Sequence, residues 1–473
     1  MPAWHAASKW YGREGGLAFS LTEGEVILRF RNLWLKTRYS FWFLPALYVL
    51  AAVVLAVVLV EADGRFPPDA FERWPRLFGA GAEGARGLLT SVASSMITVA
   101  GVVFSITLVA LSLASSQYTS RVLRNFLSDR MTQSVLGVFV GIFAYCLVVL
   151  RTIRGGSEGP FVPSVAVLVG LLLGFVGIGI LIYFIHHIST SIQASHILAA
   201  TTGETVRAID HLFPDGVAEE GAAERPEPVD VGPWHCVPAV RTGYVQSLDT
   251  AGLLAFAGER QTVVRMERGV GQYVIEGERL ASVLGTAPVD DDLRRLRGLY
   301  AVGRQRTVEQ DAAFGIRQIV DMALKALSPG VNDTTTAVMC IDHLTAILVR
   351  LSGRRIESRF RSEDGQLRLI TCGPTYADMV GEAFDQIRQN ADGNVAILEG
   401  LLGSLELLGR RTTSPQRRGV LLEHALAVAE LGRQSVPAPR DRQRLSDRSA
   451  HTLGSLTADA NAEASAAPDP ARM

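Results

Sequence analysis

The residues whose types and order could do chemistry lie in one short segment of the second half of the chain. It runs Ser328-Pro329-Gly330-Val331-Asn332-Asp333, and His343 follows. Serine, aspartate and histidine are the residue types of a hydrolase triad, in which the histidine takes the proton of the attacking serine. However, no Gly-x-Ser-x-Gly elbow surrounds Ser328 to expose it as a nucleophile. An enzyme site here is therefore kept as an alternative only.

The same segment contains residue types that end one helix and begin the next. Pro329 and Gly330 stop a preceding helix, and Asn332 or Asp333 can accept hydrogen bonds from the free N–H groups that begin the next one. A carboxylate there also complements the positive end of the helix dipole. We interpret Ser328 to Asp333 as a coupling motif that transmits movement between helices.

Charged residues flank this motif, and each has two interpretations. Asp321, Asp333, Asp342 and His343 could bind a cation, but their spacings match no defined metal-binding loop. Three arginines could bind an anionic ligand, or pair with nearby carboxylates as surface charges usually do: Arg304, Arg306 and Arg317, with Glu309, Asp311 and Asp321. We therefore expect no metal site, no cofactor and no catalytic residue.

A second pattern of interest lies in an apolar run near residue 100. Small and hydroxylic residues recur there at steps of three and four, interrupted at Leu108, so they share one face of a helix. In lipid such a face can pack tightly against another helix. Alternatively, several copies around an axis could line a narrow polar conduit. The residues of this hydroxyl stripe are Ser91, Ser94, Thr98, Gly101, Ser105, Ser112 and Ser115.

The composition divides the chain into an apolar and a polar half. The chain has 473 residues and a net charge of −1, and its apolar residues gather before about residue 190. The near-zero charge gives no global field for binding nucleic acid. Four cysteines without CxxC spacing predict neither a disulfide framework nor a zinc site, and isolated thiols fit a reducing compartment.

Four apolar runs are long enough to cross a hydrocarbon core of roughly 30 Å. They cover residues 41–60, 88–112, 134–150 and 163–185. Gly137 and Gly141 in the third run favour close packing against a neighbour. The fourth run ends at His186 and His187, which as neighbours on a helix point apart and do not form a chelating pair, so we expect an interfacial structural role for them.

Basic residues beside the runs predict the orientation, because Lys and Arg favour cytoplasmic loops. They place both termini in the cytoplasm of a multi-pass inner (plasma) membrane protein, although Arg151 and Arg154 argue against it. Residues 25–38 could form an amphipathic helix along the membrane surface. The basic residues used are Arg29, Arg31, Lys36 and Arg38 before the first run, and Arg121, Arg124 and Arg130 between the second and third.

The predicted fold class is an α-helical membrane domain of four transmembrane helices followed by a soluble α+β domain. The polar half of the chain is expected to contain a small β-rich module followed by a helical C-terminal region. Alternating strand patterns and glycines indicate the β-rich module. Beyond residue 434, few large apolar residues remain, so we expect disorder. The expected parts are residues 1–40 (cytoplasmic segment with the interfacial helix), 41–190 (transmembrane domain), 191–235 (helical extension and linker), 236–288 (β-rich module), 289–433 (mainly helical domain) and 434–473 (disordered tail).

Three stretches resemble a known family. The core Ala326-Leu327-Ser328-Pro329-Gly330-Val331-Asn332-Asp333, the stretch from Leu111 to Tyr118, and the stretch from Ala383 to Gln389 are similar to the bacterial predicted membrane proteins grouped as "domain of unknown function twenty-two fifty-four". Many of those proteins have a proline where this chain has Thr334, and a first helical position tolerates both. The resemblance implies no activity, substrate or catalytic residue.

These patterns favour an oligomeric channel or pore that the cytoplasmic domain gates. The apolar runs contain no charged residue in their interiors, whereas an ion-coupled carrier usually keeps a buried ionisable group there. The expected partners are the lipid bilayer, further copies of the chain and a small ion or solute, but not nucleic acid. The alternatives are a non-transporting membrane scaffold or signal receptor, and a membrane-tethered enzyme.

Overall fold

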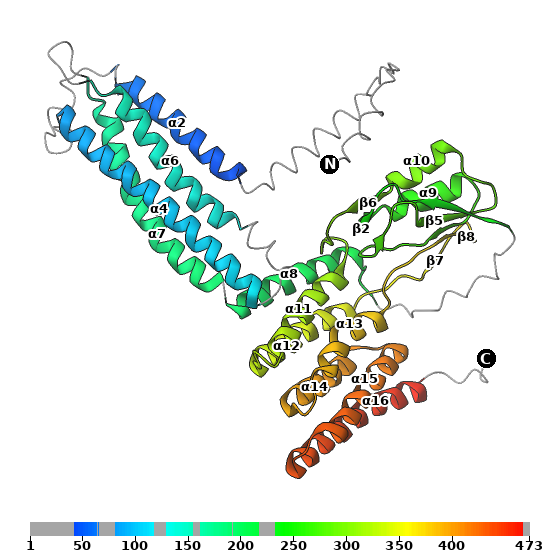
Figure 1. Cartoon of the computed structure of the whole chain (residues 1–473). Coiled ribbons are helices and arrows are strands. Elements are labelled where there is room, and N and C mark those ends of the chain that lie inside the picture. The colour runs from blue at the N-terminus through cyan, green and yellow to red at the C-terminus, as the bar shows by residue number, and fades with distance from the viewer. Residues whose placement is uncertain are drawn as a thin grey trace, which may run out of the picture. The chain divides into compact units, whose positions relative to one another are not determined.

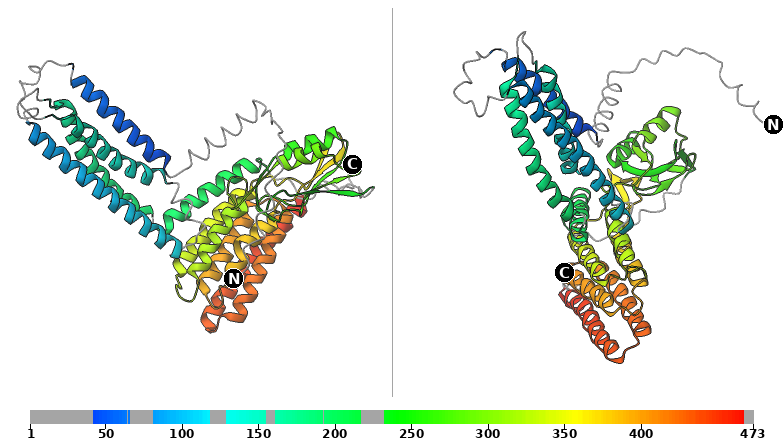
Figure 2. Two further views of the ribbon diagram at one scale, coloured as in Figure 1. Left: turned by 45° about the horizontal axis from the view of Figure 1, so that its top comes forward. Right: turned by 60° about the vertical axis from the view of Figure 1, so that its left-hand side comes forward.

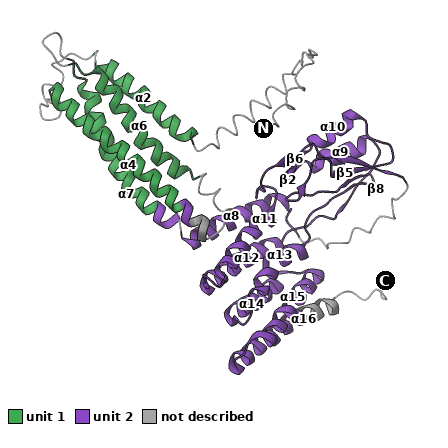
Figure 3. Ribbon diagram, viewed as in Figure 1, with its two compact units in different colours: residues 1–110, 124–187 green, residues 111–123, 188–473 purple. Residues whose placement is uncertain are grey.

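The computed structural model divides the chain into two compact units, which Figure 3 colours separately. The first comprises residues 1–110 and 124–187, and the second residues 111–123 and 188–473. The structure describes residues 42–63, 65, 81–117, 129–154, 161–191, 193–216 and 232–466. The expected interfacial helix at residues 25–38, the basic residues at 121 and 124, and the side chain of Ser115 lie outside this description.

Long helices make up the described part of the first unit, and in Figure 1 they run side by side. They are α2 (Phe43–Asp63), α4 (Ala82–Gln117), α6 (Arg130–Thr152) and α7 (Ser164–Ser191). Each overlaps one of the expected apolar runs. Their apolar sequences form helices because a helix satisfies every backbone N–H and C=O within its own segment.

Glycines set the distance between α2 and α6. A Cβ at Gly137 would lie 2.9 Å from Cα of Pro45, and one at Gly141 would lie 3.3 Å from the carbonyl oxygen of Tyr48. Small residues let two backbones approach this closely in lipid. The expected close packing of the third apolar run through Gly137 and Gly141 is therefore confirmed.

A second series of glycines receives side chains of α4 on the surface of α7. A Cβ at Gly170 would lie 2.7 Å from Cδ2 of Leu89, and one at Gly177 would lie 2.8 Å from Sδ of Met96. A Cβ at Gly174, between them, would lie 3.4 Å from both Cγ atoms of Val92. One face of α4 is thus fixed against α7 by large side chains that fit over glycines.

The second unit contains α8 (Ala194–Leu212), which is followed along the chain by two β-sheets. One sheet has the strand order β1-β5-β3-β8-β7 and the other β4-β2-β6. All strand pairs are antiparallel except β3 with β8. The strands are β1 (Trp234–Pro238), β2 (Gly243–Leu248), β3 (Val264–Met266), β4 (Tyr273–Val274), β5 (Arg279–Leu284), β6 (Tyr300–Gly303), β7 (Phe360–Glu363) and β8 (Gln366–Ile370).

The sheets of the second unit extend beyond residues 236–288, where we expected a small β-rich module. Strands β6, β7 and β8, which come later in the chain, complete the two sheets. The module also contains the helix α9 (Thr250–Glu259), and α10 (Asp290–Gly298) directly follows. A buried cluster that includes Val245, Phe256 and Leu369 joins these parts. Strand pairing over such sequence distances leaves no local sequence pattern, so the module boundary could not be predicted.

The remaining helices of the second unit pack as a stack, which Figures 1 and 2 show in several views. Helix α12 lies in its centre, in contact with α8, α11 and α14. The helices are α11 (Ala312–Ala326), α12 (Thr334–Ser352), α13 (Tyr376–Gln389), α14 (Val395–Arg411), α15 (Pro415–Ser435) and α16 (Pro439–Ala466).

The predicted disorder of residues 434–473 is wrong for residues 439–466, which form α16. Leu445 and Leu456 of this helix are 2% and 3% exposed and lie against Gly432 of α15 and Gly409 of α14. Ser449 and Thr452 are buried between them. A few leucines suffice here because glycines on the partner helices accept them and small polar residues fill the spaces between. Amino-acid composition alone does not predict this packing of leucines over glycines.

Five described helices are long and apolar enough to cross a membrane: α2, α4, α6, α7 and α12. The expected count of four is therefore not confirmed. The fifth, α12, belongs to the second unit, and its apolar residues Cys340, Leu344 and Leu348 are completely buried among its neighbours. Several apolar helices thus precede a soluble α+β region.

We expect Gly137→Val to destabilise the first unit by about 1–3 kcal/mol, because its side chain would collide with the backbone of Pro45. Thermal unfolding of the purified protein in detergent measures this as a lower Tm. The matched control is Gly179→Val, because no atom lies within 4 Å of a Cβ at Gly179. Equal Tm values for the two variants would show that α2 and α6 do not pack at Gly137.

Candidate functional site

The hydroxyl stripe lies on the side of α4 that no described helix of the same chain covers. Ser94, Thr98 and Ser105 are exposed, whereas Met96, Ala100 and Val103 are buried. Two positions along a helix correspond to a turn of about 200°, so each of these exposed residues lies across the helix from a buried one. The other described stripe residues, Ser91, Gly101 and Ser112, are exposed as well.

The stripe hydroxyls bond to their own helix. Ser91 donates to the carbonyl of Gly87 at 2.9 Å, and Thr98 donates to the carbonyl of Ser94 at 2.7 Å. A hydroxyl that donates inward keeps acceptor lone pairs that point outward. The face is therefore both polar enough to meet water and small enough to meet another helix.

The histidines at the end of α7 have different surroundings. The Nε2 of His187 lies 2.9 Å from Oδ2 of Asp129, which also accepts hydrogen bonds at the start of α6, and Tyr183 stacks on the ring. His186 is exposed. His187 thus joins the end of α7 to the beginning of α6.

The coupling motif forms the turn between α11 and α12. The preceding helix ends at Ala326, and Asn332 has the left-handed φ of 49° that lets the chain reverse. The N–H of Asp333 then donates to the carbonyl of Ala326 at 2.8 Å. Pro329 and Gly330 at the tip are exposed. Residues Ser328 to Asp333 therefore form a turn between two helices, and their coupling role stays a prediction.

Asp333 is the N-cap of α12. Its carboxylate accepts from the N–H of Thr336 at 3.0 Å and from the hydroxyl of the same residue at 2.5 Å. These hydrogen bonds lower the pKa of Asp333 because they stabilise its charged form. Thr334 is the first residue of α12, where a proline would also fit.

The residues of the alternative enzyme site bond to other groups. Ser328 donates to the carbonyl of Lys325 at 2.6 Å, and Nδ1 of His343 lies 2.8 Å from the hydroxyl of Thr202 on α8. Burial lowers the pKa of His343. Because Asp333 caps its own helix, none of these hydrogen bonds joins the three residues into a triad.

The arginines near the motif pair with carboxylates. Arg306 makes two hydrogen bonds to Asp311, at 2.8 and 3.1 Å. Arg317 bonds to Asp321 at 2.8 Å and approaches Glu382 at 3.4 Å. The four cysteines are free thiols. Across the described ranges, no group of three or more His, Cys, Asp or Glu side chains could hold a metal ion.

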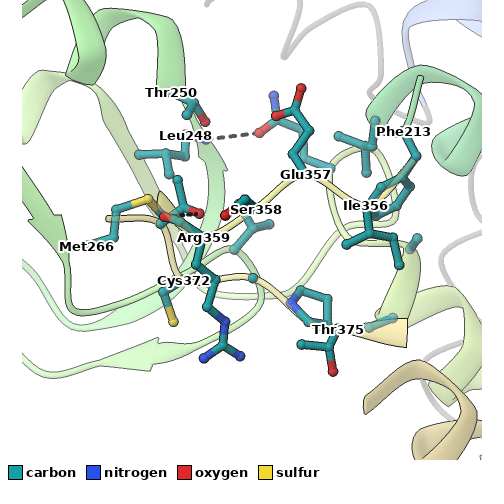
Figure 4. A pocket seen from close by; sticks show the side chains of 18 of the residues that line it. Phe213, Leu248, Thr250, Met266, Ile356, Glu357, Ser358, Arg359, Cys372 and Thr375 are labelled. Carbon is teal, nitrogen blue, oxygen red and sulfur yellow. Dashed lines mark hydrogen bonds between the residues drawn. The ribbon is translucent and has the colours of Figure 1, made fainter. Parts of the chain in front are cut away.

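The structure also reveals a cavity of about 490 Å³ within the second unit, which no sequence motif indicated. Figure 4 shows Phe213 and Ile356 on one side of it, with Leu248 and Met266 opposite. Arg359, Cys372 and Thr375 also line it. These residues come from segments far apart in the chain, so only the fold brings them together.

Several apolar helices followed by a soluble α+β region are typical of a membrane protein. The family described as "Predicted membrane protein (DUF2254)" matches residues 38–406, and the chain belongs to this family. The resemblance of the Ser328 to Asp333 motif to that family is thereby confirmed.

The chain has similar proteins in mycobacteria. It is 33% identical over 432 residues to an uncharacterized protein of Mycobacterium tuberculosis strain CDC 1551, across 88% of this chain and 81% of the relative. An uncharacterized protein of Mycobacterium bovis strain ATCC BAA-935 / AF2122/97 gives the same identity and coverage. No solved structure matches the chain.

We expect Asp333→Ala to destabilise the second unit by about 1 kcal/mol, because the first turn of α12 loses its cap. Asp333→Asn serves as the control, since asparagine accepts the same N–H bond and caps equally well. Thermal unfolding of both variants measures the difference. A Tm for Asp333→Ala equal to that of the wild type would contradict the capping role.

Proposed function

We propose that the protein is an inner-membrane homo-oligomer in which the hydroxyl stripe of α4 lines a narrow polar pore. The observation that carries the proposal is the exposure of this stripe opposite the packed face of α4. A ring of copies would bring the stripes together around an axis. Hydroxyl oxygens there would face water and a passing ion or small solute.

The membrane-spanning helices of the proposal are α2, α4, α6 and α7. Their described interiors carry no Asp, Glu, Lys or Arg, which favours passive conduction over ion-coupled transport. We assign α12 to the soluble domain, because three neighbouring helices bury its apolar residues. The basic residues beside the spans favour cytoplasmic termini and a cytoplasmic soluble domain.

Polar contacts suggest how the soluble domain could gate the pore. Helix α8, which follows α7 in the chain, is tied to α12 by the Thr202–His343 hydrogen bond. Asp210 of α8 also pairs with Arg350 at 2.6 Å and with Arg354 at 2.5 Å. Since the coupling motif begins α12, a movement of its turn would reach α8 and then α7.

The alternative is a scaffold in which the stripe is a seam between copies. The hydroxyls donate to carbonyls four residues earlier in the same helix, and this favours a seam equally, because such a face lets two helices approach closely. Conduction separates the two functions. Single-channel recording from the purified protein in planar bilayers should show discrete openings, whereas silent bilayers that contain the assembled oligomer would refute the pore.

We expect Ser105→Leu to abolish or strongly reduce the single-channel conductance while leaving the oligomer intact, because an apolar side chain would dewet the narrow pore. Native mass spectrometry of the same sample measures the assembly. The matched control is Phe104→Leu, an exposed position beside the stripe, which should keep the conductance. Loss of assembly in Ser105→Leu alone would favour the seam.

A further inference from the structure

The cavity in the second unit has the size and the wall of a small-molecule site. Its volume of about 490 Å³ falls within the range of ligand pockets, roughly 300–1,000 Å³. Met266 and Ile356 are buried in its wall, and Phe213 and Leu248 add partly buried apolar surface. This lining suits the apolar body of a ligand.

Two features of the cavity wall bear on the charge of a ligand. First, four helices begin at its wall: α9 with Thr250, α11 with Ala312, α13 with its cap Thr375, and α15 with Gln416 near its first residue. The amino end of a helix carries a partial positive charge. Carboxylates already bond to free N–H groups at three of these amino ends, Asp249 at α9, Asp311 at α11 and Asp378 at α13, whereas the amino end of α15 has only the hydroxyl cap Ser414 and so favours a negative group.

Second, one of the arginines that line the cavity has no carboxylate partner among the described residues. Asp311 is neutralised by Arg306, and Glu357 pairs with Arg361. Arg359 lines the cavity with an exposed side chain, and no carboxylate within the described part of the chain pairs with it. A guanidinium recognises a carboxylate or a phosphate by parallel hydrogen bonds.

We propose that this cavity binds a small amphipathic organic anion. Its carboxylate or phosphate pairs with Arg359, and its apolar body lies against Phe213, Met266 and Ile356. Leu212 and Phe213 are the last residue and the cap of α8, so an occupied cavity adds contacts to the end of that helix. The ligand thereby stabilises one position of α8, and its binding does not depend on whether the protein conducts.

Thiol protection in the full-length protein tests the site. Cys372 lines the cavity and is partly exposed, Cys236 is exposed elsewhere, and Cys146 and Cys340 are buried. Alkylation by the neutral reagent iodoacetamide is followed separately at Cys372 and Cys236 by peptide mass spectrometry. Cys236 therefore serves as an internal control for any change of the reagent or the detergent.

The probes share a six-carbon chain and differ in their head group: hexanoate, hexyl phosphate and hexyltrimethylammonium, with inorganic phosphate as the probe without a chain. At concentrations on the order of 10 mM, which suit ligands of this size, we expect the two amphipathic anions to slow alkylation of Cys372 about fivefold. The cation and inorganic phosphate should leave it unchanged. The stronger of the two anions identifies the preferred head group.

Arg359→Gln should remove this protection, and Arg359→Lys should keep part of it. The matched control is Arg355→Gln, an exposed arginine outside the cavity, which should behave as the wild type. Equal protection by the cation, no protection by either anion, or full protection in Arg359→Gln would each overturn the proposal.

Discussion

Hydrocarbon offers no hydrogen-bond partners, so every polar group of a membrane-spanning helix has to find one inside the protein or in water. Helix α4 satisfies its hydroxyls locally, since Ser91 and Thr98 donate to carbonyls one turn earlier. It can therefore carry a row of hydroxyls without a partner helix. Its opposite face is held by Leu89 and Met96 over the glycines of α7. Helix α4 thus has one packed side, and its exposed side carries the hydroxyls together with large apolar residues such as Phe104 and Val109. The proposed pore places the hydroxyls toward its axis and the apolar residues toward lipid or protein.

The helices of the second unit are arranged around α12. Helix α12 is held on several sides, and buried Arg417 donates to the carbonyls of Ser352 and Arg354 at its end. A cation at that place complements the negative end of the helix dipole. The capped turn at Asp333 begins the same helix, and α8 lies along it. The cavity is lined by the last residue and the cap of α8, Leu212 and Phe213.

The sequence predicted the local features of this protein well and the long-range ones poorly. Apolar run length found the four long helices of the first unit, and the Gly137 and Gly141 spacing found their closest contact. Cap chemistry placed the turn at Asp333. Three features could not be predicted because they depend on residues far apart in the chain. They are the strands that complete the sheets, the packing of Leu445 and Leu456 of α16 against α15 and α14, and the cavity that Arg359 helps to line. The exposure of the hydroxyl stripe also required the structure, since the same spacing suits a packed face.

The most direct test of the pore is the reactivity of cysteines placed along α4 in the intact membrane. In a variant whose four native cysteines are serines, Thr98→Cys and Ser105→Cys should react rapidly with the water-soluble cation methanethiosulfonate ethyltrimethylammonium. Phe104→Cys and Ile106→Cys, on either side of the stripe, should stay unmodified because they face lipid or protein. Reaction at the stripe would mean that water reaches the middle of the helix. If the stripe positions were as unreactive as their neighbours, the hydroxyls would face another helix, and the pore would be contradicted.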